Sequence, residues 1–552
     1  MGSSVAAHDV GRRLVVCFFG AVVMVVGAGL SVSCSGGGDG GDGGGGGGGG
    51  TSQSDPLFQE QWHLKNTGQA ARSAGTPGED VNVEPVWNNG RQGAGVRVAV
   101  VDDGLEIGHP DLQANVVPNQ SFNYVTRTTD PTPSDPTDGH GTQVAGVAAA
   151  VGNNNLGGRG AAPAASLVGY NLTTTGGNVS ANEADAMTRN ASAVHISNNS
   201  WGAADDRGTL DPSSLSWQTA INTGLSSGRT GKGTIYTWAA GNGAPRDNSN
   251  YDGRANFRGV IAICATDPNG KKADYSEPGA NLWVCTPSAT DDPQGLPMIT
   301  TTDLTGAAGN NSTATSCRSW ITELSDLNYT RCFNGTSSAT PLASGVIALV
   351  LQTNPNLTWR DLRLILAETA RKNDASDPDW LDIGANTIGG RYHHNHKYGF
   401  GVIDANAAVQ RALLWNNAGP QASSGSPVQN VNAQIPDNNT TGVTATVTAS
   451  ELPFNQIEWV EVSFSATDHT YFGDLQIELR NNGTGTVSRL ADKHACRPDS
   501  LCQSGGYNNW QFGTSRHLGE NPNGSWSLIV KDLAPQDSGT FQSWRIVFYG
   551  RN

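Results

Sequence analysis

The sequence predicts an α/β domain with a mostly parallel sheet flanked by helices, followed by an all-β sandwich. From Asp55 to about Trp415, short β-branched strands alternate with helical segments. From Thr441 onward, apolar residues recur at every second position in short runs separated by turn signals, which is typical of a sandwich. A chain of 552 residues is long enough for roughly two or three domains.

The composition along the chain divides it into successive segments. They are an export signal (1–34), a glycine-rich tether (35–54), the α/β domain (55–415), a polar linker rich in Pro, Gly and Ser (416–435) and the β-sandwich domain (436–552). The tether cannot bury enough apolar surface to fold, so we expect it to act as a flexible spacer.

The N-terminus carries the pattern of an export signal, in which Arg12-Arg13 precede the apolar run 14–30. Residues 31–34 then resemble a bacterial lipobox, although Leu30 stands one place before the position expected for leucine. We therefore expect a bacterial protein that is exported and lipid-anchored to the cell envelope through Cys34. Simple cleavage with secretion and a retained anchor are the alternatives, whereas a twin-arginine signal fits the flanking residues poorly.

The charge balance narrows the class of ligand. The chain has 34 basic and 49 acidic side chains and a formal net charge of −15. Such a surplus argues against nucleic acid as a partner and suits a cationic substrate or bound cations.

The cysteines indicate disulfides. Of the eight cysteines, two lie in the N-terminal segment and the others form near pairs with no zinc-site spacing. In an exported protein this pattern predicts local disulfides between Cys264 and Cys285, Cys317 and Cys332, and Cys496 and Cys502.

A candidate nucleophile lies in the stretch 333–352. Residues 335–341 are small, polar and turn-prone, and the residues from Leu342 onward are apolar all round, which predicts a buried helix. A helix N-terminus offers oriented N–H groups and positive potential to an oxyanion, so Ser337 is well placed to be a nucleophile. On this stretch alone, a Ser/Thr-rich helix cap without chemistry is an equal alternative.

Other polar side chains stand at the ends of predicted core elements. The strand 96–101 runs into Asp102 and Asp103, and His140 opens an apolar helix. Asn242 follows another strand, 234–240. The carboxyl ends of parallel strands are where open α/β sheets place their ligands, so these residues are candidates for one site.

These motifs resemble those of a known family. The order Asp102, His140, Ser337 and the segments VDDG, HGTQVAG, SWG, AAGNG and GTSSATP resemble the successive signatures of subtilisin-like serine peptidases, over about residues 55–414. The phrases DDGLEIGHPDL, DNSNYDG and DYSEPG are similar to those of kexin and furin, the proprotein convertases. The segments FGDL, NNW, PNGSW and FYG resemble the P (Homo B) domain of the same group.

The resemblance implies catalytic roles at matching positions. Ser337 would be the nucleophile and His140 the general base, with Asp102 orienting the imidazole. Asn242 would donate a hydrogen bond to the oxyanion. The implied activity is that of a serine endopeptidase.

The resemblance also implies the residues that bind substrate. The segment Ser200, Trp201 and Gly202 would add the substrate backbone as a strand. The acids implied around the substrate are Asp205 and Asp252 in the S1 pocket, Asp103 at P2 and Asp211 at P4. These acids predict cleavage of peptides or proteins after Arg or Lys.

Calcium is the cofactor that the resemblance implies. Carboxylates and carbonyl oxygens on a flexible loop are the ligands that Ca²⁺ prefers. One implied site comprises Asp55, Asp111 and Asn154 with the carbonyls of Val151, Leu156 and Gly158. A second lies near S1 and comprises Asp247 and Glu277, with Ala204 in place of a third acid.

Other expectations concern partners and alternative functions. No propeptide-sized segment lies between the tether and the α/β domain, so we expect a separate folding chaperone or folding assisted by the P domain. We also expect the protein to be a monomer. The cluster His393, His394 and His396 is interpreted as an exposed loop rather than a metal site. A broad-specificity extracellular protease and a catalytically silent binding module are the alternative functions.

Overall fold

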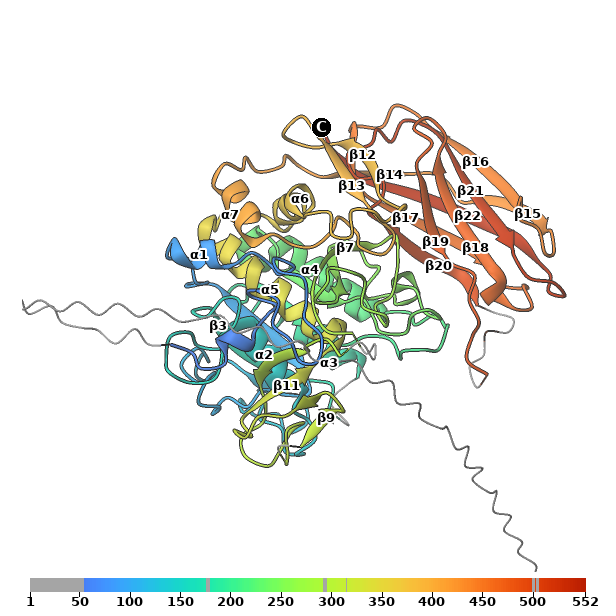
Figure 1. The fold of residues 1–552 in the computed structure, drawn as a ribbon. Helices are drawn as coiled ribbons and strands as arrows, with labels where there is room; N and C mark the ends of the chain where they lie inside the picture. Colours follow the sequence, from blue (N-terminus) through green and yellow to red (C-terminus); the bar gives the residue numbers. More distant parts are fainter. Residues whose placement is uncertain (1–53, 175–178, 291–294, 314, 499–501, 503–505) are drawn as a thin grey trace, which may run out of the picture. The chain divides into compact units, whose positions relative to one another are not determined.

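The computed structural model describes residues 54–552 except 175–178, 291–294, 314, 499–501 and 503–505 (Figure 1). The predicted export signal, the tether up to residue 53 and Cys34 lie outside the described residues. Within the described part of the chain, no helix combines the length and the apolar character needed to cross a membrane.

The α/β part is built on a seven-stranded sheet in the order β2-β3-β1-β4-β5-β6-β7, and every pair in it is parallel. Its strands are β1 (Arg97–Asp102), β2 (Phe122–Asn123), β3 (Ser166–Asn171), β4 (Ile196–Asn199), β5 (Ile235–Ala239), β6 (Val260–Thr266) and β7 (Leu282–Pro287). Because β1 lies between β3 and β4, the strand order reverses beside β1, where such sheets bind ligands.

Helices cover this sheet. They are α1 (Glu84–Asn88), α2 (His140–Ala149), α3 (Ser180–Thr188), α4 (Leu215–Gly231), α5 (Gly335–Thr353), α6 (Trp359–Thr369) and α7 (Ala405–Leu413). In α5 every residue from Ser338 to Leu351 is buried, which confirms the predicted core helix. A Cβ on Gly345 would come within 2.9 Å of the Ala148 carbonyl oxygen, so glycine allows α5 to pack closely against α2.

Short antiparallel pairs of strands lie outside the seven-stranded sheet of the α/β part. They are β8 (Ile299–Thr302) with β11 (Tyr329–Phe333), β9 (Ser316–Arg318) with β10 (Ile321–Thr322), and β12 (Leu381–Ala385) with β13 (Arg391–His394). Single turns of 3-10 helix occur at η1 (Phe58–Glu60), η2 (Ser249–Tyr251) and η3 (Phe472–Asp474).

The C-terminal part is the predicted β-sandwich, drawn in orange to red in Figure 1. One sheet holds β14 (Ala422–Gly425), β15 (Gln429–Ile435), β17 (Gln456–Ala466), β20 (Tyr507–Thr514) and β22 (Gly539–Arg551). The other holds β16 (Val443–Ala449), β18 (Leu475–Asn481), β19 (Val487–Ala491) and β21 (Gly524–Asp532). Alternate residues of β17 such as Val460, Val462 and Phe464 are fully buried, as the alternating pattern predicts.

The stretch 416–435 differs from the predicted linker. It contains β14 and β15, which both pair with β22 and so belong to the sandwich. The composition concealed these strands because their residues are mostly polar, and burial alternates between half-buried and exposed positions along both strands up to the buried Ile435 at the end of β15.

The expectation of an exposed histidine loop is wrong for His394 and His396, which are both buried. His394 Nε2 lies 2.9 Å from Ser515 Oγ, and His396 Nε2 lies 2.9 Å from Asp492 Oδ2. Both partners belong to the C-terminal sandwich, which covers this loop. The sequence of the loop contains no information about that cover.

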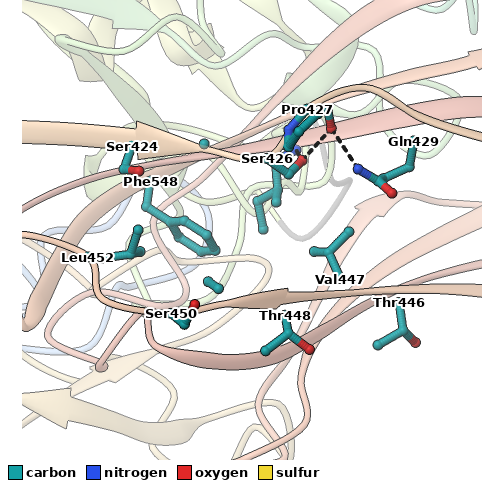
Figure 2. Close-up of a pocket in the computed structure, with 13 residues that line it drawn as sticks. Ser424, Ser426, Pro427, Gln429, Thr446, Val447, Thr448, Ser450, Leu452 and Phe548 are labelled. Atoms are coloured by element: carbon teal, nitrogen blue, oxygen red, sulfur yellow. Dashed lines mark hydrogen bonds between the residues drawn. The ribbon is translucent and has the colours of Figure 1, made fainter.

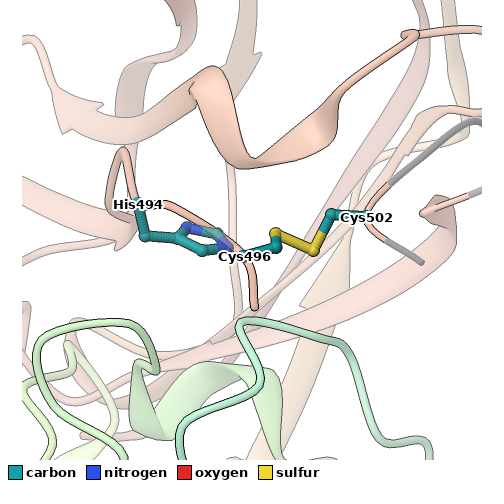
Figure 3. Close-up of side chains that lie close together, drawn as sticks. All are labelled: His494, Cys496 and Cys502. Carbon is teal, nitrogen blue, oxygen red and sulfur yellow. A yellow bond between two sulfur atoms is a disulfide. The ribbon is translucent and has the colours of Figure 1, made fainter. Parts of the chain in front are cut away.

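The predicted disulfides are present. The structure joins Cys264 to Cys285, Cys317 to Cys332, and Cys496 to Cys502. Figure 3 shows His494 beside the Cys496–Cys502 bond. This group has the composition of a metal site, but its two sulfur atoms are bonded to each other. His494 Nε2 instead lies 3.0 Å from the Gly208 carbonyl oxygen and ties the sandwich to the α/β part.

Candidate active site

The end of β1 and the start of α2 bring an acid and an imidazole together. His140 Nδ1 lies 2.8 Å from Asp102 Oδ1, and Asp102 is only 2% exposed. A Cβ on Gly141 would fall 2.0 Å from the Gly104 carbonyl oxygen, so only glycine lets the helix begin this close to the strand end. The carboxylate can only accept, which assigns the proton to Nδ1 and leaves Nε2 free to act as a base.

Asp103 supports the same helix start. Its carboxylate accepts hydrogen bonds from the backbone N–H groups of His140 (3.1 Å) and Gly141 (2.7 Å), which caps α2 from outside the helix. Burial, followed by the charge of Asp102, raises the pKa of Asp103 to about 7.

The pKa of His140 responds to both acids. Burial by itself would lower it, but the charge of Asp102, the hydrogen bond to Asp102 and the charge of Asp103 together raise the pKa of His140 above its ordinary value. These carboxylates therefore stabilise the imidazolium that forms when His140 takes up a proton.

The predicted nucleophile lies in the first turn of α5. The chain enters this helix through Gly335, whose φ of +81° favours glycine. Ser337 Oγ donates to the Ser200 carbonyl oxygen (3.1 Å), and Ser200 Oγ donates to the Ser337 carbonyl oxygen (3.0 Å). This reciprocal pair fixes the end of β4 against the start of α5.

The Asn242 side chain has a defined orientation beside Ser337. Its Oδ1 accepts from both the backbone N–H (2.7 Å) and the hydroxyl (2.8 Å) of Thr336, so its NH₂ group points away from Thr336. A pocket of about 290 Å³ is lined by Asn242, His140 and Ser337 together. The structure thus brings together the candidate base, nucleophile and oxyanion donor.

Asp252 lies beneath the backbone of the SWG segment. Its Oδ2 accepts from the Ala203 N–H (3.1 Å), and a Cβ on Gly202 would come within 2.6 Å of the same oxygen. Asp252 is 6% exposed, and burial raises its pKa, an effect that the charge of Arg254 partly offsets.

Asp205 is exposed and hydrogen-bonded to Asn242, the candidate donor to the oxyanion. Its Oδ1 accepts from the Asn242 backbone N–H (2.8 Å). The second predicted S1 acid therefore contacts the residue that lines the catalytic pocket.

The acids of the second predicted calcium site, Asp247 and Glu277, lie close to this region. Burial raises the pKa of both, and the charges of Asp247, Asp205 and Asp252 raise that of Glu277 further. A Cβ on Gly241 would fall 2.2 Å from Glu277 Oε1, so glycine lets the backbone lie directly over this carboxylate. Such a surplus of buried negative charge in a glycine-lined cradle fits a hard cation.

The acids predicted for the first calcium site, Asp55 and Asp111, both accept hydrogen bonds from Asn154. Asn154 Nδ2 donates to Asp111 Oδ1 (2.7 Å), and the Asn154 backbone N–H donates to Asp55 Oδ1 (3.1 Å). The Val151 N–H donates to the Asp111 carbonyl oxygen (2.9 Å), and the loop that carries Leu156 and Gly158 contacts both acids through Asn154. Burial and the charge of Asp55 raise the pKa of Asp111 to about 7 even though Arg159 is ion-paired with Asp55 at 2.5 Å. These oxygen donors fit Ca²⁺.

Sequence reasoning missed Glu183 and Arg254. Arg254 Nη1 donates to Asp211, the predicted P4 acid (3.0 Å), and Arg254 Nη2 donates to Glu183 (3.3 Å). A basic residue two places after Asp252 was the available signal, but the partners of Arg254 come from distant parts of the chain.

A groove of about 460 Å³ lies in the sandwich, and Figure 2 shows it. Hydroxyl, small and apolar side chains line it, including Ser426, Val447, Leu452 and Phe548, and no lining residue is titratable. This groove therefore lacks the acid–base groups that line the pocket at His140 and Ser337.

Comparison with known proteins agrees with this division. Residues 93–401 match the subtilase family, and residues 457–548 match the proprotein convertase P-domain. The chain is 34% identical over 500 residues to a PC3-like endoprotease (variant B) of Hydra vulgaris, covering 88% of this chain and 64% of that protein. It is 32% identical over 510 residues to neuroendocrine convertase 2 of Homo sapiens, covering 90% of this chain and 74% of that protein.

A solved structure shows the same fold. The serine protease of Aeromonas sobria superposes with a TM-score of 0.78 and 28% sequence identity, over 90% of this chain and 96% of that one. The same protease is also solved in complex with a chaperone, ORF2, with a TM-score of 0.78 and 28% identity over 90% of this chain and 95% of that one.

Proposed function

Because the chain belongs to the subtilase family and carries a proprotein convertase P-domain, we propose that it is a calcium-dependent serine endopeptidase that cleaves after Arg or Lys. The observation that carries the proposal is the pocket that holds His140, paired with Asp102, together with Ser337 and Asn242. The relatives named as convertases and endoproteases support it.

The reaction is acyl transfer through Ser337. Its hydroxyl leaves the Ser200 carbonyl and attacks the scissile carbonyl carbon while His140 Nε2 takes the proton. The Asn242 NH₂ group donates to the oxyanion, and Asp102 stabilises the imidazolium. His140 then protonates the leaving amine, the C–N bond breaks, and water hydrolyses the acyl-enzyme with His140 again as base.

Substrate selection rests on the acids near the SWG segment. Ser200, Trp201 and Gly202 would pair with the substrate backbone, and Asp252 with Asp205 would attract a cationic P1 side chain. Asp103 would meet the P2 side chain from its position beside His140.

Calcium would be held at two places. Asp55, Asp111 and Asn154 with the carbonyls of Val151, Leu156 and Gly158 would hold one ion, and Asp247 with Glu277 another. Bound calcium would balance the charge of Asp111 at the first place and of Asp247 with Glu277 at the second, and it would thereby stabilise the folded enzyme.

We also propose export with a lipid anchor at Cys34, or secretion, and a separate folding chaperone. The Aeromonas sobria protease solved with a chaperone supports the latter. Expression of residues 52–552 alone tests it, because soluble active enzyme from that segment would contradict the need for a partner.

The central test combines labelling with cleavage profiling. A fluorophosphonate probe is expected to label the purified protein at Ser337, and Ser337→Ala is expected to lose about a millionfold in kcat. Residual activity within tenfold of wild type would remove Ser337 from the nucleophile role. Profiling on a peptide library separates cleavage after basic residues from broad specificity.

A further inference from the structure

A buried guanidinium lies among carboxylates beside the substrate-binding segment. Arg254 Nη1 donates to Asp211 Oδ2 (3.0 Å), and Nη2 donates to both carboxylate oxygens of Glu183 (3.3 Å each). Asp252 Oδ1 is 4.0 Å from Nη1. The Arg254 side chain is 12% exposed and that of Glu183 7%, so water screens the contact between these two side chains little.

The backbone holds these groups in place. The Asp211 N–H donates to the Tyr251 carbonyl (2.8 Å), and the Gly253 N–H donates to the Asp211 carbonyl (2.8 Å). The segment at Asp211 is thereby fixed beside the segment 251–254, while Glu183 comes from the first turn of α3.

The cluster touches the edge that would bind substrate. The Arg254 guanidinium carbon lies 5.5 Å from the centre of the Trp201 ring. Trp201 is the middle residue of the SWG segment, and Gly202 covers Asp252. The guanidinium therefore lies next to the strand edge, between the predicted S1 acid and the predicted P4 acid.

The guanidinium remains charged in this position. Burial by itself would lower the pKa of Arg254, but the charges of Asp252, Glu183 and Asp211 outweigh burial and raise it. The chain thus supplies its own cation to Asp211 and Glu183.

We propose that Arg254 is a specificity-determining residue whose guanidinium occupies the place that a basic P4 side chain would take against Asp211 and Glu183. The enzyme then selects a basic residue at P1 but gains nothing from one at P4. This inference rests on the proposed function, since it concerns the same substrate-binding edge.

The test measures kcat/KM on peptides that share P1 Arg and differ only at P4, with Ala, Arg or Glu. For the wild-type enzyme, the P4 Arg to P4 Ala ratio is expected to stay within about threefold, because no uncompensated carboxylate faces P4. In Arg254→Met the ratio is expected to rise at least about tenfold, since Asp211 and Glu183 lose their internal cation.

Further variants isolate the cause. Arg254→Met combined with Asp211→Asn is expected to lose much of the gained P4 Arg preference. Arg258→Met is the matched control, because Arg258 contacts Gln421, Trp359 and Tyr549 instead of this cluster, and its ratio is expected to equal that of wild type. If Arg254→Met does not fold, Arg254→Met with Glu183→Gln leaves one carboxylate fewer uncovered and is measured in its place.

A wild-type preference for P4 Arg above about tenfold, or an unchanged ratio in the folded Arg254 variants, would overturn the inference. The same enzyme is assayed with P1 Arg and P1 Leu peptides of fixed P4. Loss of the P1 preference would reject the proposed function itself, whereas an intact P1 preference with an unchanged P4 ratio rejects only the role of Arg254.

Discussion

Two acidic clusters lie near the SWG segment and differ in how their charge is balanced. The first comprises Asp205, Asp247, Asp252 and Glu277, where burial and mutual repulsion raise the pKa of Glu277. Within it, Asp252 Oδ1 is paired with Arg254 Nη1 at 4.0 Å. In the second, Glu183 and Asp211 each accept hydrogen bonds from Arg254. We call them the open cluster and the closed cluster.

The difference shows that the number of acids near a site does not determine what binds there. Carboxylates that repel one another in a buried place favour an external cation, either a metal ion or a substrate side chain. Carboxylates that already share a guanidinium have little to gain from a second one. The closed cluster has the same residue types as a cation site but carries its own cation.

The largest expected effect comes from reducing the charge of the open cluster. Asp252→Asn is expected to lower kcat/KM for P1 Arg peptides by about a hundredfold and to change P1 Leu peptides much less, because charge-assisted hydrogen bonds contribute about 1.5–3 kcal/mol each. Steady-state kinetics on matched peptide pairs measures this.

Asp206→Asn is the matched control for Asp252→Asn. Asp206 is ion-paired with Arg246, and its side chain is 47% exposed. Cleavage of P1 Leu as fast as P1 Arg by the wild-type enzyme would contradict a cation-selective S1 pocket.

The next largest effect is expected from removing calcium, whose influence on the Tm should depend on the open cluster and not on the closed cluster. An ion bound only by the folded state stabilises it by about 2.7 kcal/mol at a hundredfold excess over its Kd, so removal of both proposed ions with EDTA is expected to lower the Tm by about 5 °C. Glu277→Gln is expected to shrink the difference in Tm between calcium and EDTA, whereas Asp211→Asn is expected to preserve it. Equal Tm values in calcium and EDTA, measured by calorimetry, would refute both metal sites.

Asp103 is intermediate between the open and the closed cluster, because its charge interacts with an imidazole, that of His140, which is charged only when protonated. The acid limb of kcat/KM reports the pKa of His140, since only the neutral imidazole accepts the Ser337 proton. Asp103 helps to raise that pKa, so Asp103→Asn is expected to move the midpoint of the limb to lower pH, by about one unit or less.

A pH–rate profile of both proteins on a peptide with a neutral P2 residue measures the shift. The neutral P2 residue avoids confusion with the predicted contact between Asp103 and P2. A midpoint that moves to higher pH would mean that Asp103 does not support the imidazolium.

The smallest effect is expected in the closed cluster. Asp211→Asn in the otherwise wild-type enzyme should change the P4 Arg to P4 Ala ratio by less than about threefold, because its charge is already paired with Arg254. The Asp211 side chain is 44% exposed, so the free energy of unfolding should change by about 1 kcal/mol or less. Denaturant unfolding and peptide kinetics check both, and a large loss at P4 Arg would show that the closed cluster binds substrate directly.

The sequence was sufficient for much of the fold because local patterns specify it. The apolar run after Ser337 predicted a buried helix, and α5 is buried over that run. Alternation after residue 441 predicted the sandwich. The same rules failed at β14 and β15, whose polar residues are held by pairing with β22 rather than by an apolar face.

The candidate site shows the same limit. Short motifs mark Asp102, His140, Asn242 and Ser337, because each stands at the end of a core element whose pattern is local. The burial of His394 and His396 depends on Ser515 and Asp492 of the sandwich, about a hundred residues further along the chain. No local pattern carries such a contact.

The sequence by itself determined which chemical groups this protein can bring to a strand end or a helix start, since backbone preferences and apolar periodicity act over a few residues. The tertiary structure alone decided which of the many acids keep an unbalanced charge. Coulomb energies change steeply with separations of a few ångströms and with burial. Arg254 reaches Glu183 across 71 residues and Asp211 across 43, and only the folded chain sets those distances.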